Sequence, residues 1–567
     1  MQVGYPKRLG KQPLPEWTNP VRIGTLQKVG PAMIPFRKES VMTSLIRKLV
    51  LCVGLLTLPT TVHAVGFEPT IRVQIQSIDT LMTLAEKAVD RYVAPGLGKN
   101  LISAALRSLG DEPFAGLDRT KPFGLYAIID ENQLDSKLVL MIPTQDSKKL
   151  REKLKKLDIT FQDNADSNIA TVNVPDVPVP FYSITADGYA YLSVLSSAPL
   201  EPKNRPWAAE VFRKKESALV SVSVNLDNLP KSYKEAATTM VETAALDIKE
   251  AKGPSWAGLV GAMIGNLGSE LINQTTELTY RLNLAPETSM LELEMELTPK
   301  AGSSLAKTIQ DRKPVGNHFT GVASPDSTAA VLLHAPLFNS DLRKIVGAML
   351  KDAEPNDPKG PALIGKAALD SLKQAVESGN LDLALSLRGP DSDKHYSVVL
   401  VTSMPNADAV LAAIRKELPN RKGGPKITDT EKLDGASILE IDLDGALPPF
   451  VADLVSDTSK LKIAFAKDRL IVSLGPDSKA LIQEAIAVKP SPASPVRLTF
   501  SAKRLQSLLE TIAPPEVADG FSRVWPKNPD LTTMVDLNIT SGSSLKVKLS
   551  LNIGLFSFGM VARSTAP

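Results

Sequence analysis

Residues 186–194 read ADGYAYLSV, and residues 466–474 read AKDRLIVSL. The two segments align without a gap, and each carries a short turn, at Asp187-Gly188 in the first and at Lys467-Asp468 in the second. Apolar and polar side chains that alternate around a two-residue turn predict a β-hairpin. The same hairpin is therefore expected in both halves of the chain.

The plan around these hairpins is also repeated. From Ile71–Ile75 onward, and again from Ala330–His334 onward, the sequence predicts a strand, helical stretches, a hairpin, a helix and two more strands. A proline-rich break follows in each half, at Pro199–Pro206 and at Pro490–Pro495, and leads into a strand, a helical region and a long closing hairpin. This shared order indicates a tandem internal duplication.

The domain boundaries follow from this repeat. We expect a first copy at 65–315, a linker at 316–327, a second copy at 328–562 and a tail at 563–567. Strands joined by tight turns favour antiparallel sheets, and helices with one apolar side favour packing on one sheet face. The predicted fold class is α+β, with antiparallel sheets and helices packed on one face.

The first 64 residues predict export. Residues 1–41 show no apolar periodicity, whereas residues 42–64 hold the basic pair Arg47-Lys48, the apolar run LVLCVGLLTLP and small residues up to Ala64. This is the pattern of a Sec signal peptide cleaved after Ala64. The apolar run is too short to span a bilayer. Two starts stay open: Met42, with 1–41 not translated, or Met1, with 1–41 as a disordered leader.

Removal of the signal peptide changes the composition. The only cysteine, Cys52, lies inside the apolar run, so the exported chain would have no disulfide, thiolate metal site or cysteine nucleophile. Residues 1–64 hold nine Lys or Arg and two Glu, so the formal net charge changes from +3 to −4. A mildly acidic chain lacks the basic surface that nucleic-acid binding requires. No later stretch is apolar over 18 residues, which predicts a periplasmic, envelope or extracellular protein without a transmembrane anchor.

Two acidic stripes are candidate sites. In the first closing hairpin Glu292, Glu294 and Glu296 alternate with apolar residues, so the three carboxylates share one strand face. The corresponding strand of the second copy carries Lys546 and Lys548. Three interpretations stay open: a cation site, an acidic face that docks against the basic one, or a solvated face with Arg281 beside the glutamates.

The second stripe precedes Gly445 and consists of Glu440, Asp442 and Asp444. A calcium loop wraps its oxygen ligands around a tight turn, and a straight strand does not provide that geometry. A solvated strand face is therefore the main interpretation of this stripe.

The sequence contains no complete catalytic signature. His318, His334 and His395 have no metal-ligand spacing, and the GxSxG elbow and phosphate-binding loops are absent. Ser304–Lys307 and Ser543–Lys546 match SxxK, but the accompanying SDN and KTG elements are missing. We therefore assign no catalytic, cofactor-binding or metal-binding residue and expect no cofactor.

Trp256–Ile272 is apolar and rich in glycine. It is too short and too polar at Asn266 and Glu270 for a membrane span. Close packing of a helix on the sheet is one interpretation, and a loosely packed lid over an apolar cavity is the other.

The signal after a doubtful start, the cysteine-free body and openings such as PTIRVQIQSIDTL and RTKPFGLYAII are similar to large secreted proteins of planctomycete-type bacteria. The resemblance implies an envelope protein without assigned chemistry, and no site residue can be carried over from it.

Three hypotheses for function remain. The first is an exported, non-enzymatic envelope protein that binds a partner protein or builds a structure. The second is a carrier of an apolar, lipid-like ligand in a cavity between sheet and helices. The third is a hydrolase whose catalytic residues follow no recognisable motif.

Overall fold

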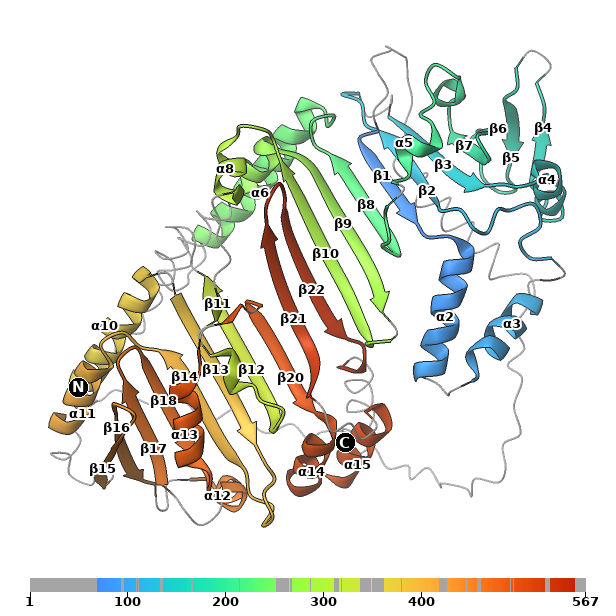
Figure 1. Cartoon of the computed structure of the whole chain (residues 1–567). Coiled ribbons are helices and arrows are strands. Elements are labelled where there is room, and N and C mark those ends of the chain that lie inside the picture. The colour runs from blue at the N-terminus through green and yellow to red at the C-terminus, as the bar shows by residue number, and fades with distance from the viewer. Residues whose placement is uncertain are drawn as a thin grey trace, which may run out of the picture. The chain divides into compact units, whose positions relative to one another are not determined.

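The computed structural model describes residues 69–555 apart from several gaps, of which the longest are 251–264, 311–315, 337–347, 349–361, 418–425 and 526–530. The expected signal peptide and its cleavage site at Ala64 lie outside the described residues, as do Asp444, His318 and most of Trp256–Ile272. Within the described residues twenty strands form one antiparallel sheet, accompanied by many helices (Figure 1). The fold is therefore mixed α and β with antiparallel strands, as the sequence predicts.

Ten strands of the large sheet come from the first half of the chain. They are β1 (Ile71–Ile75), β2 (Phe123–Ile128), β3 (Lys137–Pro143), β4 (Thr160–Gln162), β5 (Ala170–Asn173), β6 (Phe181–Ala186), β7 (Tyr189–Val194), β8 (Val220–Asn225), β9 (Thr275–Ala285) and β10 (Met290–Pro299). Their order across the sheet is β4-β5-β6-β7-β3-β2-β1-β8-β9-β10, with every pair antiparallel.

The other ten strands come from the second half. They are β12 (Ser327–Pro336), β13 (Asn380–Arg388), β14 (Ser397–Ser403), β15 (Ile427–Leu433), β16 (Ala436–Asp442), β17 (Lys460–Ala466), β18 (Arg469–Leu474), β20 (Val496–Ser501), β21 (Leu531–Ser541) and β22 (Leu545–Asn552). Their order is β15-β16-β17-β18-β14-β13-β12-β20-β21-β22. Each strand thus has a counterpart with the same neighbours in the first half.

The two hairpins quoted from the sequence occupy equivalent places. Ala186 pairs with Tyr189 in the first and Ala466 with Arg469 in the second, so each is closed by a two-residue turn. In the first turn Asp187 and Gly188 both have positive φ, at 54° and 76°. Two positive φ angles define the type I′ turn that matches the twist of antiparallel strands.

The halves join where β10 pairs with β22 (Figure 1). Their register matches Met290 to Asn552 and Leu297 to Leu545. The two hairpins align residue by residue, and the strand registers extend this alignment across both halves of the sheet. In it Leu293 of β10 takes the position that Leu549 of β22 takes in the other half. These two residues also pair with each other. The junction therefore has a local two-fold axis through one residue pair.

The helices and short elements of the first half fill the connections. They are α2 (Ile78–Tyr92), α3 (Gly98–Ser108), α4 (Ser147–Lys155), η2 (Ala198–Leu200), α5 (Ala208–Val211), α6 (Lys231–Glu250) and α8 (Ser304–Gln310). Asp146 caps α4, because its carboxylate accepts hydrogen bonds from the backbone nitrogens of Lys148 and Lys149 at 3.0 and 3.1 Å.

Similar elements follow in the second half. They are β11 (Gly316–Asn317), η3 (Thr320–Val322), α10 (Ala362–Ser378), α11 (Ala407–Glu417), α12 (Pro449–Val455), α13 (Ser478–Ala487), β19 (Ser491–Pro492), α14 (Ala502–Ile512) and α15 (Pro515–Val524). The segment expected as a linker, 316–327, contributes Phe319 and Val322 to a buried cluster and pairs β11 with β19. It is therefore integrated into the second half.

Helices pack on both faces of the sheet, which differs from the expectation of one covered face. Leu470 and Ile471 are neighbours on β18 and point to opposite faces. Ile471 lies in the cluster that includes Leu481 and Ile482 of α13, whereas Leu470 packs against the cluster that includes Val410 and Leu411 of α11. The strands between these two helices are therefore buried on both sides.

The two outermost strands are short or irregular. Within the described residues β4 pairs only with β5, and β15 pairs only with β16. The first has three residues, and the second carries a register shift between Asp429 and Lys432. Short and bulged edges limit pairing with further chains.

No helix of the described part is long and apolar enough to cross a membrane.

Candidate functional site

The acidic stripe of β10 lies against the basic residues of β22. Glu294 is opposite Lys548 and Glu296 is opposite Lys546 in the register. Lys548 Nζ lies 2.7 Å from a carboxylate oxygen of Glu292, and Lys546 Nζ lies 3.4 Å from one of Glu296. We call this group, with Arg281 and Glu216, the charged seam.

Arg281 lies at the centre of the charged seam. Its guanidinium contacts the carboxylates of Glu216 at 2.9 Å and of Glu294 and Glu296 at 2.7 Å each. The side chains of Arg281 and Glu216 are only 15% and 4% exposed. Paired charges of this kind are costly to separate, because a buried carboxylate without its cation keeps its desolvation penalty.

The network shifts two pKa values. Burial alone would lower the pKa of Arg281, but hydrogen bonds to Glu216 and Glu296 outweigh it and raise that pKa above its ordinary value. Burial alone would raise the pKa of Glu296, yet hydrogen bonds from Ser544 and Arg281 leave that pKa below its ordinary value. All four glutamates are thus engaged by cations of the chain itself. Arg281 acts within the first half, and the pairs of Lys546 with Glu296 and of Lys548 with Glu292 join the two halves.

The second stripe is arranged differently. Glu440 pairs with Lys460 at 2.7 Å, and Asp442 is opposite the same lysine in the strand register. Asp442 is exposed at the end of β16, and Asp444 lies outside the described residues. The structure therefore brings Glu440 and Asp442 together along one strand.

The opposite face of the central strands is apolar. One residue from each of ten consecutive strands falls on a single line across the sheet, and we call this line the apolar row. It consists of Phe123, Ile75, Val220, Leu282, Leu293, Leu549, Leu537, Val496, Leu333 and Leu383. Nine strand spacings of about 4.8 Å give it a length of about 43 Å.

The apolar row is half exposed throughout. None of its ten residues is buried, and Leu293 and Leu333 are 43% and 40% exposed. Tyr280 and Leu385, on the neighbouring lines of the same face, are 48% and 38% exposed. Isolated exposed leucines are ordinary on protein surfaces, whereas a continuous line of partly exposed apolar residues is a candidate interaction surface.

Helical clusters border the apolar row on the same face. Leu305 and Ile309 of α8 pack near Leu297 of β10, and Phe521 and Trp525 of the α14–α15 region pack on Phe500 of β20. Figure 1 shows α8 and α14–α15 at opposite ends of the central strands. The apolar row therefore lies between two helical clusters on this face of the sheet.

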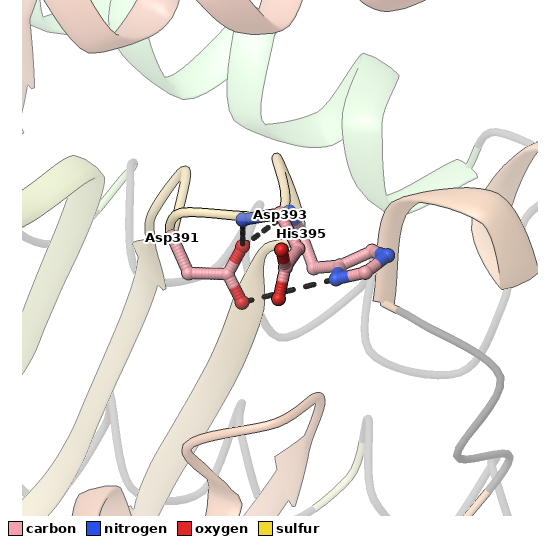
Figure 2. A group of neighbouring side chains, drawn as sticks. All are labelled: Asp391, Asp393 and His395. Carbon is pink, nitrogen blue, oxygen red and sulfur yellow. Dashed lines mark hydrogen bonds and ion pairs between the residues drawn. The ribbon is translucent and has the colours of Figure 1, made fainter.

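The turn between β13 and β14 brings together Asp391, Asp393 and His395 (Figure 2). Their possible ligand atoms lie within 4.8 Å of one another. Asp391 also accepts hydrogen bonds from the backbone nitrogens of Asp393 at 2.9 Å and His395 at 2.8 Å. Asparagine and aspartate side chains commonly close turns in this way, so the turn accounts for Asp391 without a ligand.

His334 and Asp382 form a buried pair across β12 and β13. The imidazole Nδ1 contacts the carboxylate of Asp382, and both side chains are almost fully buried. His334 Nε2 has no hydrogen-bond partner in the described part of the chain. The backbone nitrogen of Asp382 donates to the Ser403 hydroxyl at 3.3 Å. A nucleophile is activated by the side chain of a base, so this contact does not define an active site.

A groove of about 470 Å³ lies between α10 and α11. Four alanines and six polar or charged residues line it, and the polar ones include Asp370, Ser371 and Asn406. The Asn406 amide donates to Gln374 at 2.5 Å, and the Ser371 hydroxyl donates to the carbonyl of Pro405. These polar groups stabilise helix packing.

Sequence reasoning missed the apolar row and the Asp391 turn. Glutamate and apolar residues alternate along β10, so the sequence identifies its two faces. It does not show which face is exposed, and we expect the glutamates on the exposed one. In the structure the carboxylates of β10 are only 18–25% exposed, whereas Leu293 is the more exposed residue. The spacing of aspartates and histidine in DSDKH, residues 391–395, was the available signal for the turn.

Replacement of Arg281 tests the charged seam. Arg281→Met should lower the free energy of unfolding by about 3 kcal/mol, because Glu216 would stay buried without its cation. Adding Glu216→Gln to this variant should restore part of the loss. Arg497→Met is the matched control, since its pair with Asp536 is more exposed and should contribute at most about 1 kcal/mol. Equal losses in urea unfolding for the two arginine variants would contradict the assignment.

Two replacements of Asp391 separate the turn from a metal site. Asp391→Ala should cost about 1–2 kcal/mol, since two backbone hydrogen bonds are lost, whereas Asp391→Asn should retain most of the stability because its amide oxygen accepts them. Thermal unfolding with and without Ca²⁺ or Zn²⁺ measures both effects. A metal site is indicated instead if added metal stabilises only the unaltered chain and the asparagine variant behaves like the alanine variant.

A scan against protein-family models finds no match, and searches of curated proteins and of solved structures find no similar chain. The chemistry of this chain therefore has to be inferred from its own surfaces, of which the apolar row is the most extended.

Proposed function

We propose that this chain is an exported, non-enzymatic binding protein whose binding surface is the apolar row. The observation that carries the proposal is an inverted burial pattern on the strands of the row. On β13 the leucines at 383, 385 and 387 are half exposed, whereas Asp382, Ala384, Ser386 and Arg388 on the other face are buried. A chain that exposes its leucines and buries its polar residues gains nothing in stability from that arrangement, which favours a binding role.

The polar groups support a non-enzymatic role. The glutamates of the charged seam are paired with cations, Asp391 accepts two backbone hydrogen bonds, and His334 contacts Asp382. A catalytic site requires a nucleophile, a base and a place for the reacting atom in mutual reach. The apolar row offers a surface, and its ten side chains include no titratable group.

A tandem duplication is the second part of the proposal. Two observations support it. The ten strands of the first half and the ten of the second follow the same antiparallel order, and the two hairpins occupy equivalent places in that order. The apolar row takes one residue from each of five strands of the first half, β2, β1, β8, β9 and β10. It then takes one from each of their counterparts in the second half, in the reverse order β22, β21, β20, β12 and β13. Both halves keep apolar residues there, while Glu292 on β10 corresponds to Lys548 on β22, so the apolar surface is the shared feature.

Export is the third part, and it rests on residues 42–64. If the chain is produced with its natural amino terminus in a bacterium with a Sec pathway, we expect the exported product to begin at Val65. Intact-mass measurement and amino-terminal sequencing of the exported fraction test this. A product that stays in the cytoplasm with residues 42–64 attached would contradict it.

Substitutions in the apolar row test the binding surface. Leu293→Lys and Leu333→Lys should each reduce the fluorescence of the apolar dye ANS by at least half, because a charge interrupts the exposed apolar surface. Their stability should change by no more than about 1 kcal/mol, since both positions are already solvent-accessible. Leu246→Lys on α6 is the control, with a side chain 52% exposed away from the row. Unchanged dye fluorescence in both row variants would contradict the proposed surface.

A further inference from the structure

We propose that a basic face on α4 binds an anionic lipid surface through the phosphates of its head groups. The basic face consists of four exposed lysines, Lys148, Lys149, Lys155 and Lys156. It lies at the edge of the sheet, because α4 packs beside β4, where the Arg151 guanidinium lies 4.9 Å from the centre of the Phe161 ring (Figure 1). This surface is separate from the apolar row.

The lysines of the basic face lack counter-charges. On the same helix Arg151 pairs with Asp163 at 2.7 Å, and Lys153 also has a partner. Among the described residues no carboxylate forms an ion pair with a lysine of the basic face, and Glu152 is the one acidic residue of α4. The basic face therefore keeps a net positive charge, which an anionic partner would neutralise.

Two of these lysines are placed where they lower the stability of the helix. The first turn of a helix carries positive partial charge from the aligned peptide dipoles, so cations are unfavourable there. Lys148 and Lys149 lie in the first turn of α4, and that turn contains no acidic residue. Lysines at an unfavourable position favour a role other than folding.

The equivalent helix of the second half folds without these two lysines. α11 follows β14 as α4 follows β3. The two helices align at their apolar residues, so that Lys148 corresponds to Asp408 and Lys149 to Ala409. Only the last turns of both helices carry cations in common, where the peptide dipoles favour them. The fold therefore does not require a positive charge at the start of α4.

The composition of the basic face distinguishes between classes of partner. Lysine is a point charge on a flexible stem, whereas arginine provides the rigid fork that recognises single phosphates and carboxylates. Protein–protein interfaces are depleted in lysine, and sites for single-stranded nucleic acids add aromatic rings for stacking. The basic face has no aromatic side chain. A layer of anionic head groups requires only positive charge, and clusters of lysine bind such layers.

The spacing of the lysines suits contact with one flat surface. The pair at 148–149 and the pair at 155–156 are seven residues apart, which is about 10 Å along the helix axis. Each lysine near an anionic membrane strengthens binding by a factor of about five. This attraction acts within the Debye length, which falls from about 10 Å at 0.1 M salt to about 3 Å at 1 M.

The test uses the chain that begins at Val65, which contains every described residue. We expect it to sediment with vesicles of phosphatidylglycerol and phosphatidylcholine in equal amounts, and not with vesicles of phosphatidylcholine alone. The combined variant Lys148→Gln, Lys149→Gln should bind about tenfold more weakly or less, and salt at about 1 M should remove the binding. The matched control is Arg415→Gln, Lys416→Gln, which removes the same charge from α11 and should weaken binding by less than about threefold.

Unfolding temperature provides a second measurement. The combined variant Lys148→Gln, Lys149→Gln should unfold at the same or a slightly higher temperature, because it removes cations from the start of α4. A clear fall in that temperature would indicate a structural role for the two lysines and would contradict the inference.

The other outcomes separate the possible partners. Equal weakening by the α11 control would mean that net charge drives binding, and no sedimentation with either kind of vesicle would exclude a lipid surface. Equal binding to both kinds of vesicle would indicate an apolar contact, and binding to duplex DNA in place of vesicles would indicate a nucleic acid. Each of these results would overturn the inference. Leu293→Lys should leave vesicle binding unchanged, so failure of this inference does not affect the apolar row.

Discussion

The pairing of β10 with β22 is the contact on which the rest of the structure depends. It joins ten strands from each half into one sheet, and its two faces have opposite chemistry. Arg281 and its glutamates hold the polar face together, and Leu293 against Leu549 places the apolar row in line across the junction. Without this register Lys546 and Lys548 would not lie beside the glutamates of β10, and the apolar row would not continue across the junction.

The register between β10 and β22 is determined by two features together: the ion pairs between their charged side chains and the alternation of polar and apolar residues along both strands. Side chains have a period of two along a strand, so a slip of β22 by one residue would bring Lys546 and Lys548 to the face of Leu293. A slip of two residues would keep the faces but would move these lysines away from Glu296 and Glu292. The register is therefore fixed twice, once by burial of polar groups and once by ion pairs.

Local features of the sequence predict local structure well. The hairpins at 186–194 and 466–474 follow from alternation and turn chemistry, which act over a few residues. The union of the halves through β10 and β22 depends on contacts about 250 residues apart, and the lysines opposite the glutamates were its only visible sign. The exposed face was also hard to predict, because a leucine-rich face is normally the buried one. On β13 the smaller residues Ala384 and Ser386 allow close approach of the covering elements, and Leu385 is left outside.

Within the described residues, the short edge strand β4 and the bulged edge strand β15 limit growth of the sheet at its ends. The β10–β22 junction is an intramolecular contact, because both strands belong to the same chain. Two separate halves would have to find each other at their bulk concentration, whereas a covalent connection holds them at an effective concentration in the millimolar range. The pairing of the two halves therefore does not weaken when the protein is diluted, and a chain that is exported, as proposed, would keep the apolar row continuous at any concentration.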